Sequence, residues 1–362
     1  MRLIELENHY THDTISSGIK QLHDEGVICN ENKDKIEIRF DVVDIEKISK
    51  SENILCFDFI TAIKKIKSFS MSNGKYVFSS YNKDRKIINR KENKKKRLGY
   101  EYYQTHFDDK NIEIDDNIIN KIHCSDSLEF LKKMSNNCVD LIFTSPPYNF
   151  GISYNSTDDT GKWNEYFQKL FAIFTECIRI LKDGGRIIVN IQPMFSDYIP
   201  SHHMISNFFF QQGLIWKGEI LWEKNNYNCK YCTWGSWKSP SSPYLKYSWE
   251  FIEIFCKNTI KKHGEKDYID IQAEEFKQWV YAKWSIAPER KMKQFEHDAM
   301  FPEELAKRVI KLFSYKNDIV LDPFNGVGTT TKVARELGRR YIGIDIDKTY
   351  CETANKRLNT IL

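Results

Sequence analysis

The sequence lacks any apolar run long enough to cross a membrane, and its first residues do not form a secretory signal peptide. A membrane-spanning helix needs about 20 consecutive apolar residues, and a signal peptide needs a shorter apolar core behind positive charges. These two absences predict a soluble, cytoplasmic protein that makes no membrane contact.

The cysteines show none of the pairing that a disulfide framework or a zinc site requires. There are nine of them, an odd and scattered set, which indicates a reducing compartment. Cys229 and Cys232 form the only Cys-x-x-Cys, and no second pair follows at zinc-finger spacing. Because structural zinc needs four ligands, the sequence predicts no metal site.

A strong excess of charge of either sign is also missing. The chain carries 54 basic and 50 acidic residues, for a net charge of +4. This balance permits a polyanionic partner without requiring one, so the local distribution of charge matters more than the total. Its 362 residues are ample for one catalytic domain and a smaller one.

One stretch of the chain is strongly basic. Residues 83–97 contain nine lysines and arginines against Asp84 and Glu92. Such a run is usually a solvated linker, but in front of a catalytic domain it could also contact phosphates and give salt-dependent affinity. We therefore expect an N-terminal α+β region over 1–82, a basic linker over 83–115 and a catalytic domain over 116–362.

The N-terminal region offers little recognisable chemistry. Thr11 can cap a helix that continues through Leu22 and ends near Gly26, and the alternating stretch Ile36 to Phe40 reads as a strand. This outline is that of a winged helix. A small α+β appendage used for packing or dimerisation explains it equally well.

The chemistry centres on Thr144-Ser145-Pro146-Pro147-Tyr148-Asn149, which follows a short apolar run predicted to be a buried strand. The prolines stiffen the chain and remove two N–H donors, while the carbonyls stay free to accept. Ser145 and the Pro146 carbonyl could thus hold an exocyclic amine, with Tyr148 stacked on the ring that bears it.

A second stretch has the pattern of a nucleotide-binding turn. The apolar strand Ile319 to Leu321 leads into Asp322-Pro323-Phe324-Asn325-Gly326-Val327-Gly328-Thr329-Thr330, and a helix is predicted from about Thr331. Glycines there let the backbone approach a ligand at a helix N-terminus. The next strand ends in Asp345, at the spacing of a ribose-binding carboxylate.

Strands and helices alternate through residues 116–362, which predicts an α/β fold with a doubly wound, mostly parallel sheet. The stretch Trp163 to Leu181 reads as a helix whose aromatic stripe faces the core. Gly184-Gly185 is expected to end that helix before a strand over Arg186 to Ile191. Two further strands are expected over Gly213 to Trp222 and Trp249 to Phe255.

Together, the two motifs resemble the DNA amino-methyltransferases, over about residues 118–362. The catalytic motif precedes the cofactor motif, as in the permuted beta group of that family. His123-Cys124-Ser125-Asp126-Ser127-Leu128 resembles a segment that helps to hold the cofactor. Phe301-Pro302-Glu303-Glu304-Leu305 resembles the motif that leads into the cofactor strand.

The resemblance implies an S-adenosylmethionine-dependent enzyme that flips a base out of double-stranded DNA and methylates its exocyclic nitrogen. A serine at the first motif position favours cytosine-N4, and adenine-N6 is the alternative. The resemblance assigns catalytic contacts to Ser145, Pro146, Pro147 and Tyr148, and cofactor contacts to Asp126, Thr144, Phe301, Pro302, Asp322, Phe324, Gly326, Gly328, Thr329 and Asp345.

Two polar, aromatic segments, near 224–246 and 261–293, are the expected DNA-recognition inserts. The resemblance further implies a restriction-modification system, with a companion nuclease that is not a stable subunit, and a monomer or homodimer. Other readings stay open: a DNA-binding regulator whose methyltransferase-like domain only binds ligand, or methylation of RNA or protein by a similar core.

Overall fold

The computed structural model describes residues 9–25, 28–32, 35–38, 48, 50–65, 69–72, 75–78, 107–149, 162–193, 197–225, 234–290 and 300–360. The chain divides into two compact units, Met1–Leu98 and Gly99–Leu362, which we describe separately. Among the described residues, no helix is both long and apolar enough to span a membrane. The basic run at 83–97 and the Cys229/Cys232 pair lie outside the described residues.

The N-terminal unit repeats one order of elements, a helix followed by a two-stranded antiparallel hairpin. The predicted first helix is confirmed, because the Thr11 hydroxyl accepts a hydrogen bond from the Thr14 amide at 3.3 Å. The elements are α1 (His12–Asp24), β1 (Ile28–Asn32), β2 (Lys35–Ile38), α3 (Ile54–Lys65), β3 (Phe69–Ser72) and β4 (Lys75–Phe78).

The two helices of this unit pack through a small residue. A Cβ at Gly18 of α1 would lie 2.9 Å from the Leu55 side chain of α3, so only glycine permits this approach. Asn53, just before α3, donates to the Thr14 carbonyl at 3.1 Å. The hairpins form two separate sheets, and a winged helix stays a prediction for this unit.

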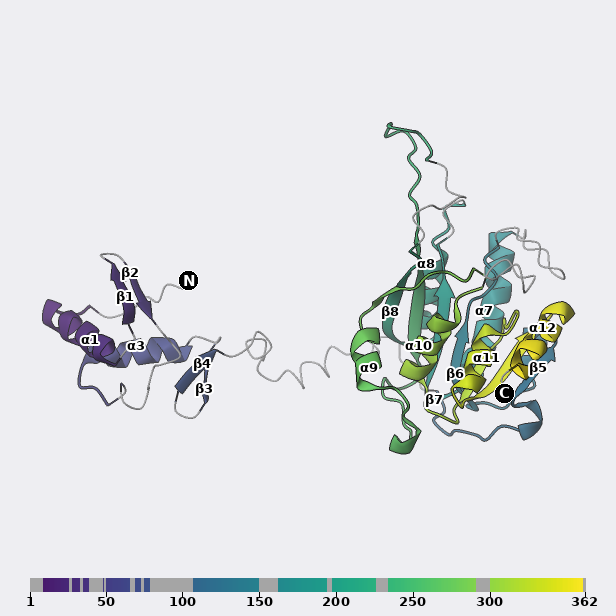
Figure 1. Ribbon diagram of the computed structural model, residues 1–362, viewed down its shortest axis with the longest axis horizontal. Helices are drawn as coiled ribbons and strands as arrows, with labels where there is room; N and C mark the ends of the chain where they lie inside the picture. The colour runs from purple at the N-terminus through teal and green to yellow at the C-terminus, as the bar shows by residue number, and fades with distance from the viewer. Residues whose placement is uncertain are drawn as a thin grey trace. The chain divides into compact units, whose positions relative to one another are not determined.

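The C-terminal unit is built on one eight-stranded sheet (Figure 1). Strand β9 is antiparallel to both of its neighbours and the other pairings are parallel, which confirms the predicted fold class. Across the sheet the order is β10 (Lys283–Ser285), β8 (Ile215–Glu223), β9 (Trp249–Cys256), β7 (Leu181–Ile191), β6 (Val139–Thr144), β11 (Ile319–Asp322), β12 (Arg340–Asp345) and β5 (Lys121–Cys124).

Helices cover both faces of this sheet, and each face has its own apolar core. One core receives side chains of α6 (Ser127–Leu131), α7 (Trp163–Ile180) and α8 (Ser201–Gln211). The other receives side chains of α9 (Ala273–Trp279), α10 (Glu303–Phe313), α11 (Thr329–Glu336) and α12 (Lys348–Asn359). Short 3-10 turns lie at Asp116–Ile118 and Lys266–Tyr268.

The predicted aromatic stripe of α7 does face the core, with Phe167, Leu170 and Phe174 buried. The expectation that Gly184-Gly185 ends this helix is wrong. The helix stops at Ile180, and the glycines lie inside β7.

A buried lysine explains the earlier stop of α7. The Lys257 ammonium donates to the carbonyls of Ile178 and Leu181, both at 2.7 Å, and so satisfies acceptors that a helix end leaves open. Burial lowers the pKa of Lys257 to about 8. Since Lys257 is 76 residues away from Leu181 in the chain, local sequence cannot reveal this cap.

Candidate active site

The catalytic and cofactor motifs lie side by side. Strands β6 and β11 are adjacent and parallel, so the segments that follow Thr144 and Asp322 leave the sheet at the same edge. The Thr144 hydroxyl donates to Asp322 Oδ1 at 2.6 Å. In open α/β sheets this carboxyl edge is where ligands bind, as the sequence predicts.

Asp322 is engaged from within the protein. Besides Thr144, its carboxylate accepts from the Thr330 hydroxyl at 2.7 Å and from the Phe324 amide at 3.0 Å. Burial raises its pKa to about 6, although these donors pull in the opposite direction. The side chain therefore organises the turn between β11 and α11, and direct contact with a cofactor stays a prediction.

The glycine turn has the backbone conformation that its sequence suggests. Gly326 and Gly328 have φ values of +50° and +81°, and Gly328 occupies the N-cap position of α11. The Gly326 amide donates to Asp345 Oδ2 at 2.7 Å, and the Asp347 amide donates to Oδ1 at 2.9 Å. Burial raises the pKa of the Asp345 carboxyl. The turn is thus fastened to the end of β12.

The other residues expected to contact cofactor lie around this edge with different degrees of access. Asp126 is exposed at the N-cap of α6, next to Ser125, whose amide donates to the Asp345 carbonyl at 2.9 Å. Phe324 is partly buried, and Thr329 is buried against Arg357. Phe301 packs 5.0 Å from the ring of Phe143, and Pro302 precedes α10.

The catalytic segment is held by bonds from two other elements. Ser145 Oγ donates to the Asn190 carbonyl at the end of β7 at 3.1 Å, and lies 2.9 Å from Tyr148 Oη. From α7, the Tyr166 hydroxyl donates to the Pro147 carbonyl at 2.6 Å. Strand β7 and helix α7 therefore fix the segment before any ligand arrives.

The structure adds three residues that we did not predict as part of the site, Asn190, Lys224 and Glu250. Tyr148 donates to Glu250 Oε2 at 3.2 Å, the Asn190 amide donates to the same oxygen, and Lys224 forms an ion pair with Oε1. The available signal was a carboxylate in the apolar stretch that forms β9, because a buried charge needs partners. The identity of the partners was not accessible from that pattern.

The first expected recognition insert projects from the sheet. We call residues 234–246 the recognition arm; Figure 1 shows it extending beyond the ends of β8 and β9. Trp234 and Trp237 are 62% and 65% exposed. The Lys246 ammonium lies 3.5 Å from the ring centre of Trp234, which joins a cation to an exposed aromatic face.

The second expected insert is described as far as residue 290, and much of it is packed into the domain. Trp279 and Trp284 are buried, and the Trp284 indole donates to the Trp279 carbonyl at 2.9 Å. Neither ring can stack on a base in this arrangement. Tyr281, by contrast, is exposed.

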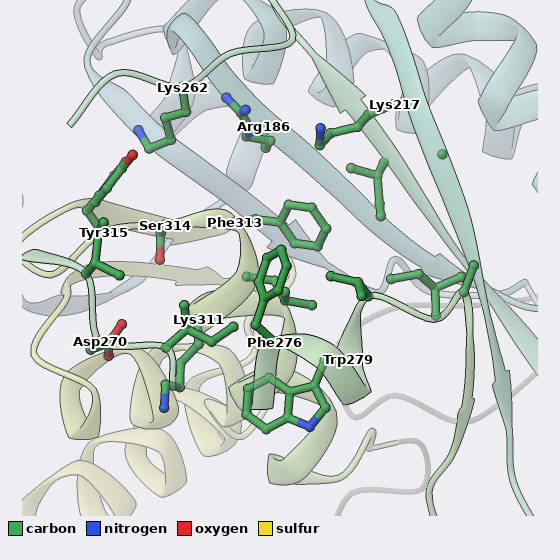
Figure 2. A pocket seen from close by; sticks show the side chains of 18 of the residues that line it. Arg186, Lys217, Lys262, Asp270, Phe276, Trp279, Lys311, Phe313, Ser314 and Tyr315 are labelled. Atoms are coloured by element: carbon green, nitrogen blue, oxygen red, sulfur yellow. The ribbon is translucent and has the colours of Figure 1, made fainter. Parts of the chain in front are cut away.

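A cavity of about 550 Å³ lies toward the opposite end of the strands, between β8 and the helices α9 and α10 (Figure 2). Its cations are largely matched by neighbours: Lys262 pairs with Asp140 at 3.0 Å, and Lys311 pairs with Glu275. Arg186 donates to the Ile260 carbonyl at 2.6 Å. This internal pairing leaves the carboxyl edge as the better candidate for chemistry.

The two motif segments meet at one carboxyl edge of a doubly wound sheet, where folds of this class bind their ligands. Residues 139–356 match the family N6_N4_Mtase, DNA methylase, and the chain belongs to that family. The resemblance to the DNA amino-methyltransferases is thereby confirmed.

Individual relatives agree with this assignment. The chain is 30% identical over 253 residues to the type II methyltransferase M.HpaI of Haemophilus parainfluenzae, covering 66% of this chain and 74% of the relative. It is equally 30% identical to M2.DpnII of Streptococcus pneumoniae, covering 65% and 87%.

A solved structure also resembles the chain. That of the protein TTHA0409 from Thermus thermophilus, complexed with S-adenosyl-L-methionine, covers 66% of this chain and 93% of its own, at 25% identity with a TM-score of 0.53.

Proposed function

We propose that the protein transfers a methyl group from S-adenosylmethionine to the exocyclic N4 of a flipped cytosine in double-stranded DNA. The observation that carries this proposal is the position of Ser145, held by the Asn190 carbonyl one residue beyond the Thr144–Asp322 contact. That contact joins the segment proposed to bind the amine to the turn proposed to bind the cofactor.

The residues of the turn fit the cofactor. Backbone N–H groups at the start of α11 lie behind two left-handed glycines, and can bind the carboxylate of an amino acid. The partly exposed carboxylate of Asp345 can accept from ribose hydroxyls. Bound S-adenosylmethionine supplies a methyl group on a cationic sulfur, which is the electrophile.

The protein contributes positioning. An exocyclic amine is a poor nucleophile, because its lone pair is delocalised into the ring, and it is hidden inside the duplex. Ser145 Oγ and the Pro146 carbonyl accept from the two N–H groups, and the Tyr148 ring stacks on the extruded base. Holding the nitrogen in line with the methyl group supplies much of the rate enhancement.

The choice of cytosine rests on Ser145. In the family, serine at this position is more typical of cytosine-N4 enzymes and a carboxylate or amide of adenine-N6 enzymes. The serine hydroxyl is a weaker acceptor than a carboxylate, and Ser145 already donates its proton to the Asn190 carbonyl, which leaves its lone pairs for the amine. Adenine-N6 is the alternative.

We further propose a restriction-modification role in the cytoplasm, where the DNA substrate lies. Relatives carrying the name type II methyltransferase support this role. A companion nuclease would act separately, and the protein would work as a monomer or homodimer. The catalytic domain would span 116–362, preceded by a basic linker over 83–115 that contacts phosphates and an N-terminal α+β region over 1–82.

The test is to incubate the protein with labelled S-adenosylmethionine and unmethylated genomic DNA, digest the DNA to nucleosides, and identify the labelled one by mass spectrometry. N4-methylcytosine is the expected product. N6-methyladenine would keep the mechanism and overturn the base, and the absence of any methylated nucleoside would overturn the proposed activity.

Two variants separate the catalytic from the cofactor assignment. Ser145→Ala should cut turnover while cofactor affinity stays near wild type, since the side chain contacts the amine. Asp345→Ala should lower cofactor affinity, because it removes both the ribose acceptor and the acceptor of the Gly326 amide. Equal loss of cofactor affinity in both variants would show that one assignment is misplaced; calorimetric titration with S-adenosylhomocysteine measures it without turnover.

A further inference from the structure

A buried carboxylate adjoins the catalytic segment. Glu250 is 6% exposed on β9, an antiparallel strand separated from β6 by β7. Desolvating a carboxylate costs free energy unless other groups compensate the charge, and here Lys224 and the Asn190 amide do so. Their arrangement leaves Oε2 in contact with the Tyr148 hydroxyl.

The proposed reaction needs an acceptor for a proton. When the exocyclic nitrogen takes a methyl group it becomes cationic and must lose one N–H proton to restore the neutral base. A serine hydroxyl can receive that proton only if its own proton moves on, since a protonated hydroxyl is a strong acid. In a site closed around a flipped base, the proton therefore needs a fixed route.

The described side chains form such a route. Ser145 Oγ lies 2.9 Å from Tyr148 Oη, and Tyr148 Oη lies 3.2 Å from Glu250 Oε2. The first distance lies in the usual range of an O–H···O hydrogen bond, and the second is a longer hydrogen bond. The Tyr148 hydroxyl is held in this series of hydrogen bonds because it also accepts from the Asn190 side-chain amide at 3.3 Å.

We propose that Glu250 is the terminal proton acceptor of a relay that runs from the target amine through Ser145 and Tyr148. This inference rests on the proposed function and deepens it. As the N–C bond forms, the C–S bond breaks and its electron pair stays on sulfur. For the transfer, the serine hydroxyl turns its proton from the Asn190 carbonyl toward Tyr148 Oη, 2.9 Å away. The amine proton then passes to Ser145 Oγ, the serine proton to Tyr148 Oη, and the tyrosine proton to Glu250, which ends as a carboxylic acid.

Lys224 has a positioning role in this relay. Its ammonium is fixed by the ion pair with Glu250, by Gln192 Oε1 at 3.3 Å and by the Trp222 ring at 5.4 Å. An adjacent ammonium offsets part of the cost of burying the carboxylate and holds it in one orientation. The ion pair also engages Oε1 of Glu250, so that Oε2 faces the Tyr148 hydroxyl.

The central experiment compares Glu250→Gln with Glu250→Asp in single-turnover methylation across pH. Glu250→Gln should lower the methyl-transfer rate by about 100-fold, within the range for general base catalysis. The acid limb of its pH–rate profile should disappear. Glu250→Asp should restore part of the rate. Affinities for S-adenosylhomocysteine and for DNA, measured without turnover, should stay near wild type.

The matched control is Glu253→Gln, since Glu253 is a second buried carboxyl of β9 but pairs with Glu219 instead of the catalytic segment. It should leave the methyl-transfer rate unchanged. A loss in Glu250→Gln that is accompanied by equal losses of cofactor and DNA affinity, with no rescue by aspartate, would overturn the relay in favour of a structural role.

A double variant tests the route itself. If Glu250 acts through Tyr148, Glu250→Gln combined with Tyr148→Phe should be no slower than the slower single variant, whereas independent roles would multiply the losses. If the wild-type protein methylates DNA and Glu250→Gln does so at the same rate, the relay is overturned but the proposed function stands. A wild-type protein that methylates no nucleoside would overturn the proposed function, and the relay with it.

Discussion

Thr144 donates a hydrogen bond of 2.6 Å to Asp322, and this contact joins the ends of two neighbouring parallel strands whose residues are 178 positions apart in the chain. The acceptor is a fully buried carboxylate with a raised pKa. The segment that is proposed to hold the amine and the turn that is proposed to hold the cofactor are thus fastened to each other directly.

Thr144→Val should therefore destabilise the protein. It leaves a lone pair of the buried Asp322 carboxylate without a donor, and a hydrogen bond to a charged group contributes about 1.5–3 kcal/mol. Urea unfolding at pH 7 measures the loss. The control is Thr175→Val, whose hydroxyl is exposed on α7 and donates to the Phe171 carbonyl. Equal losses in the two variants would contradict the assigned role.

Gly328→Ala should reduce both stability and cofactor affinity. The φ of +81° is costly for alanine, and its Cβ would come within 2.8 Å of the Ala354 Cβ. Gly338→Ala is a matched control, with a φ of +71° but open space around the added Cβ. Both variants should lose about 1–2 kcal/mol from backbone strain. Only Gly328→Ala should lose further stability from the steric clash. It should also lose cofactor affinity, measured by calorimetric titration.

The stability of the protein should fall as pH rises from 6 to 8. Burial raises the pKa of Glu253 to about 8, and the neighbouring Glu219 adds to the shift. A glutamate in the unfolded chain titrates near 4.3, so in this window the unfolded state has lost its proton while the folded state keeps it. The contribution is full below about pH 4.3 and is lost as pH rises through the folded value.

The expected slope from this group is up to about 1.4 kcal/mol per pH unit. Glu253→Gln should remove that part of the slope, since the amide does not titrate, whereas Glu352→Gln on the exposed side of α12 should not. Urea unfolding at pH 6, 7 and 8 gives the comparison. Parallel curves for wild type and Glu253→Gln would contradict the raised pKa.

The recognition arm should contribute to the affinity for DNA and not to the affinity for the cofactor. Trp234→Ala or Trp237→Ala should each weaken DNA binding by about 5- to 160-fold, since stacking on a base contributes about 1–3 kcal/mol. Lys238→Ala should reduce the slope of log affinity against log salt by about 0.9 if that lysine contacts a phosphate. Fluorescence anisotropy with labelled duplex DNA measures both effects.

Trp216→Ala is the control for the arm, because that tryptophan is 53% exposed but lies near the other end of β8. Its DNA affinity should match wild type, and S-adenosylhomocysteine affinity should be unchanged in all these variants. A loss with Trp216→Ala equal to that of the arm tryptophans would indicate general loss of stability.

The local pattern of the sequence was sufficient to predict most strands of the large sheet. The apolar stretches around Leu141 and Val320 read as buried strands and are buried, and the glycine turn after β11 has the left-handed residues that its sequence suggests. Such features depend on neighbours within a few positions, through periodicity, chain stiffness and φ preferences.

The N-terminal unit shows the limit of that approach. Its first helix follows from the Thr11 cap and an apolar spacing, but the packing of α1 against α3 at Gly18 is found only in the structure. A glycine inside a helical pattern does not indicate by itself which residue packs against it.

By itself, the sequence determined the alternation of strands and helices, the two motifs and their order, and through these the family. Only the tertiary structure decided that Glu250 reaches Tyr148, 102 positions away, and that Lys257 ends α7. A charged residue within an apolar stretch indicates that the buried charge needs partners. Which residues become its partners depends on strand order and register, and these are set by the packing of the whole sheet.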